Sequence, residues 1–236
     1  MTPFFQLHRD LPREGPGTPE DVIWALDLAG TPDGAWICDA AAGPGADAAT
    51  LAVQRPQARI VAVEKMAHFV REAEARLAGF GERVQVRQGD MAAPGGPFDL
   101  IWCAGGLYFL GVTEGLRSWR SALRPGARVA FSEPCFPGNP PSALAKAFWQ
   151  DHPAATDLAG IAARVRAAGF HLLGHRMVIG AGWRAYYQPL EARITMLRLT
   201  ADAALTAVLD AEQREIDLWR KAPDEIAYAL LVVAPE

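Results

Sequence analysis

Apolar runs and helix-like patterns alternate along most of this chain. Short apolar stretches typical of strands occur at 35–39, 60–64, 84–87, 98–103 and 127–132. Helical periodicity fills the intervals at about 46–54, 66–79 and 112–123. Arg124-Pro-Gly126 ends the last helix, because proline lacks an N–H and glycine accepts a left-handed backbone. Strands that alternate with helices through short connections predict a parallel sheet covered on both faces.

The last third of the chain has a different pattern. Residues 143–168 are predicted as helix and 170–179 as a sixth strand, and about forty helical residues, 183–222, precede a seventh strand at 226–233. The insertion is too long for a turn, so we interpret it as a cap over the ligand-binding edge of the sheet. The alternative is a helical pair packed on the sheet face.

The predicted fold class is therefore α/β, a doubly wound, seven-stranded, mostly parallel sheet with a helical cap insertion. We expect a single domain over 1–236, with an N-terminal loop segment at about 1–20, because two glycines and a proline in 13–17 break any regular element.

Composition narrows the function classes. The formal net charge of −4 gives no basic footprint for nucleic acid. Three cysteines, Cys38, Cys103 and Cys135, cannot all pair, and we interpret them as thiols of a reducing compartment. No apolar run approaches the ~20 residues of a membrane span, and the first residues do not resemble a signal peptide. We expect a cytoplasmic monomer or homodimer that binds no membrane, and no metal, because histidines and cysteines lack ligand spacing.

The strongest chemical signal follows the first strand, in Asp39-Ala-Ala-Ala-Gly43-Pro-Gly45. Glycines let the backbone approach a ligand, and the helix that follows points free N–H groups at it. The segment also fits a G-x-G-x-x-A dinucleotide fingerprint. However, the Asp39 carboxylate would repel a pyrophosphate and attract an ammonium group. The alternative role for Asp39 is that of a loop or helix cap.

Two further acids follow the second and third strands. Glu64, before Lys65 and Met66, can accept hydrogen bonds from both hydroxyls of a ribose, or can be a solvated acid. Asp90 can accept from the amine of adenine while Met91 packs on the ring, although this segment also fits a common turn. All three acids lie at carboxyl ends of successive strands, where open α/β sheets bind ligands.

These residues, with Phe98-Asp-Leu-Ile-Trp102 and Leu123-Arg-Pro-Gly126, resemble the class I S-adenosylmethionine-dependent methyltransferases over roughly 30–180 and the closing strand. The resemblance implies that the last strand is antiparallel and that S-adenosylmethionine is the cofactor. The expected cofactor-binding residues are Asp39, Ala41, Gly43, Gly45, Glu64, Lys65, Met66, Asp90, Met91 and Cys103.

A narrower resemblance, to a subgroup of small bacterial methyltransferases of unassigned substrate, rests on segments 11–17, 101–108 and 183–190. Two residues depart from the family pattern. Ala41 replaces a usual glycine; we expect alanine to fit only with φ below zero and to weaken cofactor binding. Ala104 replaces an acid that is usual in the subgroup; if that acid is a catalytic base in the relatives, this chain lacks it.

The sequence gives weaker evidence for catalytic residues than for cofactor-binding residues. Methyl transfer from a sulfonium is a direct displacement that depends mainly on positioning, and a base is needed only if the acceptor must lose a proton. Each candidate could instead serve packing or ion pairing. The candidate catalytic residues are Tyr108, Glu133, Tyr186, Tyr187 and His8. The candidate substrate-binding residues are Arg13, Gly17, Tyr108, Trp183, Tyr186 and Tyr187.

The leading hypothesis is methyl transfer to a small-molecule acceptor, which aromatic residues in 183–187 suggest is apolar or aromatic. A nicotinamide-dependent oxidoreductase would need pyrophosphate beside Asp39. A non-catalytic S-adenosylmethionine-binding protein is the third possibility, on account of Ala41 and Ala104.

Overall fold

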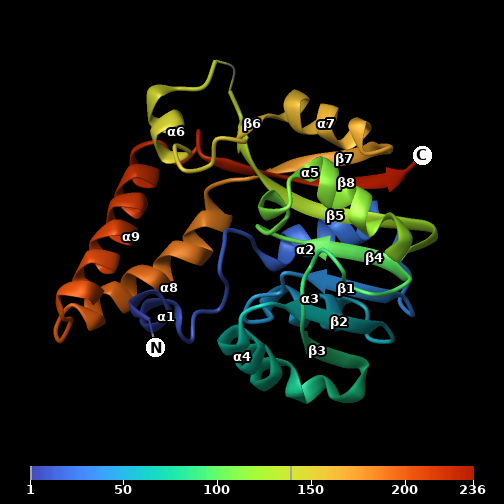
Figure 1. Ribbon diagram of the computed structural model, residues 1–236, viewed down its shortest axis with the longest axis horizontal. Helices are drawn as coiled ribbons and strands as arrows, with labels where there is room; N and C mark the ends of the chain where they lie inside the picture. Colours follow the sequence, from blue (N-terminus) through green and yellow to red (C-terminus); the bar gives the residue numbers. More distant parts are fainter. Residues whose placement is uncertain (1, 139) are drawn as a thin grey trace.

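The computed structural model describes residues 2–138 and 140–236 and arranges them as one mixed β-sheet between layers of helices (Figure 1). The strand order is β3-β2-β1-β4-β5-β8-β7, and the two-residue β6 pairs with β5 outside this path. The strands are β1 (Trp36–Ala40), β2 (Arg59–Glu64), β3 (Val84–Gln88), β4 (Phe98–Cys103), β5 (Leu123–Phe136), β6 (Thr156–Asp157), β7 (Phe170–Val178) and β8 (Ala227–Pro235).

The five strands β1 to β5 pair in parallel, so their carboxyl ends meet at one edge of the sheet. The last strand, β8, lies between β5 and β7 and runs antiparallel to both. Its residues from Ala227 to Ala234 are buried, as the apolar run predicts. The predicted fold class is therefore confirmed, with β6 as a small addition.

Nine α-helices are described in these residues, besides three short 3₁₀ turns. The helices are α1 (Pro3–His8), α2 (Pro19–Leu28), α3 (Ala46–Gln54), α4 (Ala67–Leu77), α5 (Val112–Trp119), α6 (Ala143–Phe148), α7 (Leu158–Ala167), α8 (Ala181–Leu197) and α9 (Ala203–Lys221). Apolar residues of α2, α3 and α4 share one core cluster, and those of α5 and α7 share the other. The sheet is thus covered on both faces. No helix within the described ranges is long and apolar enough to cross a membrane.

Two segments differ from the expectation. Residues 143–168 are not one helix: α6 ends at Phe148, and α7 begins after Asp157, whose side chain accepts from the Gly160 N–H. Pro153 lies between them, where it would clash in a helix interior. Residues 3–8, expected as loop, form α1, with Leu7 and His8 buried. A six-residue helix is too short to be stable alone and depends on packing, which periodicity cannot show. Residue 1 of the expected loop segment lies outside the described residues.

Helices α8 and α9 form the long insertion between β7 and β8. They pack against each other and against α1. Figure 1 shows all three beyond the ends of the strands rather than over a sheet face, at the edge where β1 to β5 finish. This arrangement places the insertion where it can cover a ligand.

Candidate active site

A cavity of about 680 Å³ lies at the carboxyl edge of the sheet. One end is lined by the segments that follow β1, β2, β3 and β4. The other end is lined by α1, the segment after it, α8 and α9. The cavity therefore spans the junction between the sheet and the capping helices.

The loop after β1 depends on left-handed backbone. Gly43 has φ 53° and Gly45, which caps α3, has φ 87°. A Cβ on Gly45 would lie 3.2 Å from the Ala73 Cβ of α4, so only glycine lets these helices approach closely. The turn exposes the start of α3 to the cavity, where its N–H groups can face a ligand.

Ala41 contradicts the expectation of a negative φ. Its φ is 62°, in the left-handed region that costs an alanine about 1 kcal/mol or more. A Cβ on Gly106 would lie 2.8 Å from the Ala41 Cβ, so the methyl group also lies close to the loop after β4. Ala41 therefore has a strained backbone conformation in the folded protein.

Asp39 lines the cavity although only 2% of its surface is exposed. Its Oδ2 is buried and has no hydrogen-bond partner. Burial, and then the charges of Asp47 and Glu64, raise the pKa of this carboxyl well above its usual value. A cation placed beside Asp39 would relieve both effects.

Glu64 is more than a solvated strand-end acid. It is 7% exposed, and its two oxygens accept hydrogen bonds from the Gly43 N–H at 2.9 Å and the Met66 N–H at 2.7 Å. The side chain thus joins the loop after β1 to the turn after β2. Each carboxylate oxygen retains a second acceptor site that a hydroxyl group can use.

The remaining strand-end candidates form a more open part of the cavity. Asp90 is exposed, and its Oδ1 accepts from the Ala92 N–H. Met91 and the exposed Lys65 and Met66 line the same region. An acid beside flexible apolar side chains is a suitable environment for a planar base.

The structure does not bring every candidate to the cavity. Cys103 is fully buried, and Ala104, Gly105 and Gly106 line the cavity in its place. Gly45 shapes the turn without lining the cavity. The Gly105 N–H donates a hydrogen bond to the Ser132 Oγ at 2.8 Å.

Glu133 also lies outside the lining, although it is an unusual acid. It is 3% exposed, its Oε2 has no partner, and burial raises its pKa to about 7. Its place inside β5, paired with Ala229 of β8, explains the burial.

The aromatic candidates separate into two groups. Tyr108 and Tyr186 line the cavity. Tyr187 and Trp183 are 2% exposed; the Tyr187 hydroxyl donates to Glu215, and Trp183 packs among aromatic rings that include Trp149. Tyr187 and Trp183 therefore pack beneath the residues that line the cavity and do not line it themselves.

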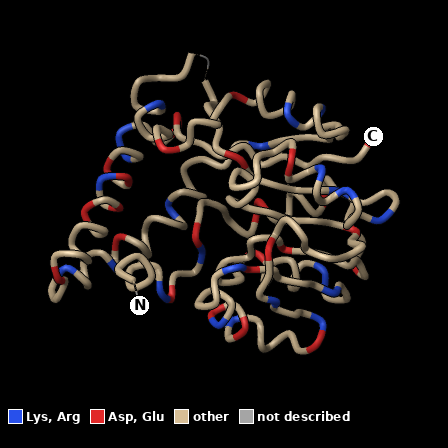
Figure 2. Tube along the Cα trace, viewed as in Figure 1, with Lys and Arg blue, Asp and Glu red and all other residues tan. Residues whose placement is uncertain are grey.

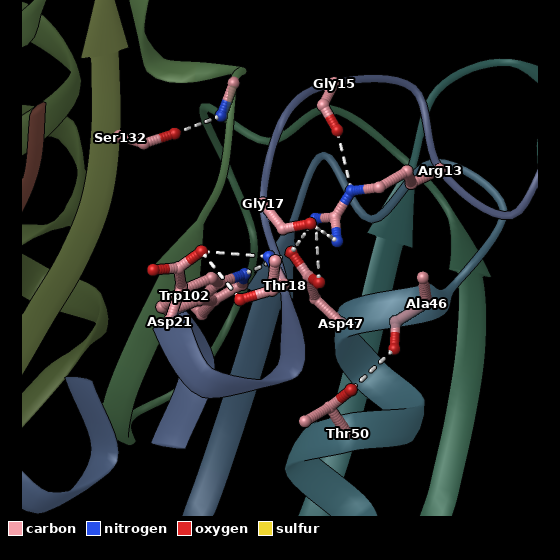
Figure 3. A network of polar contacts seen from close by, with 11 residues as sticks. Arg13, Gly15, Gly17, Thr18, Asp21, Ala46, Asp47, Thr50, Trp102 and Ser132 are labelled. Atoms are coloured by element: carbon pink, nitrogen blue, oxygen red, sulfur yellow. Dashed lines mark hydrogen bonds and ion pairs between the residues drawn. The ribbon is translucent and has the colours of Figure 1, made fainter. Parts of the chain in front are cut away.

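Arg13 anchors the N-terminal loop (Figure 3). Its guanidinium donates to the Gly15 and Gly17 carbonyls and to the Asp47 carboxylate at 3.0 Å. Asp47 also accepts from the Trp102 Nε1 at 3.2 Å. Because these bonds occupy the guanidinium, we regard Arg13 as an anchor of the loop rather than as a substrate contact. Gly17 donates its N–H to the Gly182 carbonyl and so joins the loop to α8.

His8 lies at the capped end of the cavity and is 2% exposed. Its Nδ1 contacts the Glu14 Oε2 at 2.7 Å, and its Nε2 lies 3.8 Å from the Glu212 Oε1. Burial acts to lower the pKa of His8, but the bond to Glu14 and the charge of Glu212 outweigh it and raise the pKa to about 9.

Sequence reasoning missed the acids at this end of the cavity. Glu14, Glu212 and Glu215 all line it. The spacing of Glu212 and Glu215 places them on one face of a helix, but charges at such spacing are usually solvated, so the pattern alone gave no reason to choose them.

Comparisons with known proteins agree with this geometry. Residues 37–126 match a family model described as a methyltransferase domain. No curated protein sequence matches the chain significantly. Among solved structures, the S-adenosylmethionine-dependent methyltransferase of Geobacter sulfurreducens, in complex with S-adenosylhomocysteine, has a TM-score of 0.84 at 18% identity and covers 99% of this chain and 98% of its own. The corresponding complex from Thiobacillus denitrificans has a TM-score of 0.84 at 19% identity, covering 99% and 98%. YjhP from Escherichia coli has a TM-score of 0.82 at 19% identity, with 99% of each chain covered.

The structural likeness extends over the whole chain and establishes the fold, while the sequence match covers β1 to the start of β5. The segments that line one end of the cavity fall within that match. Residues 37–126 thus match a methyltransferase domain, and the chain as a whole has the fold of the S-adenosylmethionine-dependent methyltransferases to which it is similar.

Proposed function

We propose that this protein transfers the methyl group of S-adenosylmethionine to a small-molecule acceptor held between the sheet edge and the capping helices. The observation that carries this proposal is the continuous cavity of about 680 Å³ with a strand-end half and a capped half. Its size is typical of small-ligand sites. It offers room for a cofactor and for an acceptor beside it.

The strand-end half fits the cofactor. The unpartnered Asp39 Oδ2 would accept from the ammonium group of the methionine moiety, Glu64 from the ribose hydroxyls, and Asp90 from the adenine amine. When bound, S-adenosylmethionine supplies a methyl group activated by an adjacent sulfonium. A pyrophosphate would instead lie against the buried Asp39, which disfavours the nicotinamide alternative.

The chain's own contribution to the reaction is mainly positioning. Ala104 lines the cavity with a methyl group, so no acid is present at that position to remove a proton. Tyr108 and Tyr186 can orient an acceptor, and the capping helices limit access of water. His8 is the remaining candidate for contact with the acceptor.

Calorimetry with S-adenosylhomocysteine and NAD tests this function. We expect micromolar binding of the former and none of the latter. Asp39→Asn should weaken S-adenosylhomocysteine binding about tenfold or more, whereas Asp224→Asn, at an exposed position outside the cavity lining, should not. Tight NAD binding without a response to S-adenosylhomocysteine would overturn the proposal.

A further inference from the structure

The capped half of the cavity carries an excess of negative charge. Three carboxylates line it: Glu14 from the N-terminal loop, and Glu212 and Glu215 from α9. Acidic and basic positions are interspersed along α9 (Figure 2), and these two acids are the charged residues of that helix that line the cavity. The side of α9 that lines the cavity is therefore acidic.

The cations in the lining do not neutralise these acids fully. Arg13 is engaged by Asp47 and by backbone carbonyls, and Lys65 follows β2 at the cofactor end. His8 is the cation that contacts the acids, through Glu14 at 2.7 Å. Burial raises the pKa of the half-buried Glu14, and partial desolvation raises the pKa of Glu215, which is exposed at its outer side and accepts from the Tyr187 hydroxyl at 2.8 Å.

An incomplete hydrogen-bond arrangement marks where a ligand atom fits. The His8 Nε2 is buried and has no hydrogen-bond partner, and it lies 3.8 Å from the Glu212 Oε1. One nitrogen atom could lie at an ordinary distance of about 2.9 Å from both atoms, because that separation is shorter than twice this distance. The Glu14 Oε1 is also buried without a partner. A donor with several N–H groups matches these acceptors.

Aromatic side chains surround the same end of the cavity. Phe4 of α1 and Tyr186 of α8 line this end, Tyr108 and Phe109 from the segment after β4 line the cavity beside it, and their rings favour both an apolar body and a nearby cation.

From this arrangement we infer that the acceptor is an amine with an apolar or aromatic body, whose ammonium group is held by Glu212, Glu215 and Glu14 beside His8. The inference rests on the proposed function, since it names the acceptor class of the same cavity. An anionic acceptor would meet the three carboxylates and be repelled.

Binding of an ammonium group should also change the protonation of His8. His8 interacts with Glu14 from the loop, with Glu212 and Glu215 from α9 and with His68 from α4. Glu72 of α4 and Tyr186 of α8 interact with Glu14 in the same cluster. A second cation beside the imidazolium favours its neutral form. His8 then releases a proton to solvent, and its Nε2 accepts from the ammonium.

The test uses the full chain saturated with S-adenosylhomocysteine and three matched probes, phenethylamine, 2-phenylethanol and phenylacetate, in calorimetry. We expect phenethylamine to bind at least tenfold more tightly than the alcohol, phenylacetate to bind least, and proton release with the amine in buffers of different ionisation enthalpy. Glu212→Gln should weaken phenethylamine about tenfold and leave S-adenosylhomocysteine unchanged, whereas the exposed Glu225→Gln should alter neither.

Absence of a preference for the amine, including absence of binding by all three probes, would overturn the inference. Failure of S-adenosylhomocysteine to bind in the first titration would instead count against the proposed function, so the two failures are distinguishable.

Discussion

At the scale of single residues, the sequence predicts the acids that line the strand end of the cavity better than it predicts the contacts that fix their positions. The acids after β1, β2 and β3 were identifiable because the family pattern fixes their order. The left-handed backbone of Ala41 was not, because the strain comes from the turn around it. The packing of Ala41 against the loop after β4 involves residues more than sixty positions away.

Ala41→Gly should increase stability. Glycine relieves the left-handed strain, about 1–2 kcal/mol, while its greater freedom in the unfolded chain offsets about 0.4–1 kcal/mol, so the expected net gain is up to about 1.5 kcal/mol. Chemical denaturation measures it. The neighbouring Ala42→Gly relieves no left-handed strain and should lower the free energy of unfolding; a similar loss in Ala41→Gly would contradict the interpretation.

Glu64→Ala should lower both the affinity for S-adenosylhomocysteine and the free energy of unfolding. Loss of hydrogen bonds to the ribose should reduce the affinity for S-adenosylhomocysteine by about 1.5–3 kcal/mol. The Gly43 and Met66 N–H groups also lose their acceptor, so the free energy of unfolding should fall by about 1–3 kcal/mol. Calorimetry and urea unfolding measure the two, with the exposed Glu74→Ala as the control. Unchanged affinity and stability would instead support the alternative from the sequence that Glu64 is a solvated acid.

At the scale of secondary structure elements, strands and central helices were predictable because alternation and apolar runs are local signals. The start and end of α3 were predicted at the observed residues. The break between α6 and α7, and the existence of α1, were not. Pro153 marks the break locally, although the helical pattern on both sides of it hides this signal. Helix α1 depends on contacts that join distant segments, such as the donation from Arg193 of α8 to the Leu7 carbonyl at 2.7 Å.

The contact between α1, the N-terminal loop and α9 should make stability depend on pH. The folded state raises the pKa of His8 from 6.5 to about 9, so it binds the proton more tightly than the unfolded chain. This stabilisation is fully present below pH 6.5 and is lost as pH rises toward 9. We expect a loss of about 1–3 kcal/mol over that interval.

Thermal or urea unfolding across this pH range measures the effect. His8→Gln should flatten the decline between pH 7 and 9, whereas the exposed His175→Gln should keep it. The raised pKa of Glu133, about 7, affects a lower interval, between the ordinary carboxyl range and neutrality, and is common to all variants. A decline that persists in His8→Gln would assign it to another group.

At the scale of the whole molecule, different contacts hold the sheet edge and the cap in position. The sheet edge is fixed by strands buried on both faces, which is why its ligand-binding end could be predicted from the order of elements. The cap shares an apolar core with the sheet, and Arg13 also links the N-terminal segment to Asp47 of α3, while the Gly17 N–H links the same segment to the Gly182 carbonyl of α8. We therefore expect the N-terminal segment and the start of α8 to close over the ligand together.

Hydrogen exchange with and without S-adenosylhomocysteine tests this closure. Protection should rise in residues 8–18 and 183–190 as well as in the loop after β1, because opening of the cap exposes the first two segments together. Arg193→Gln, which removes the donors to the Gln6 and Leu7 carbonyls, should reduce the protection of the N-terminal segment while the loop after β1 keeps its own. Arg214→Gln, an exposed position on α9, should leave the pattern unchanged. Protection confined to the loop after β1 and the ends of β2 and β3 would show that the cap does not respond to the cofactor, and closure would then have to depend on the acceptor alone.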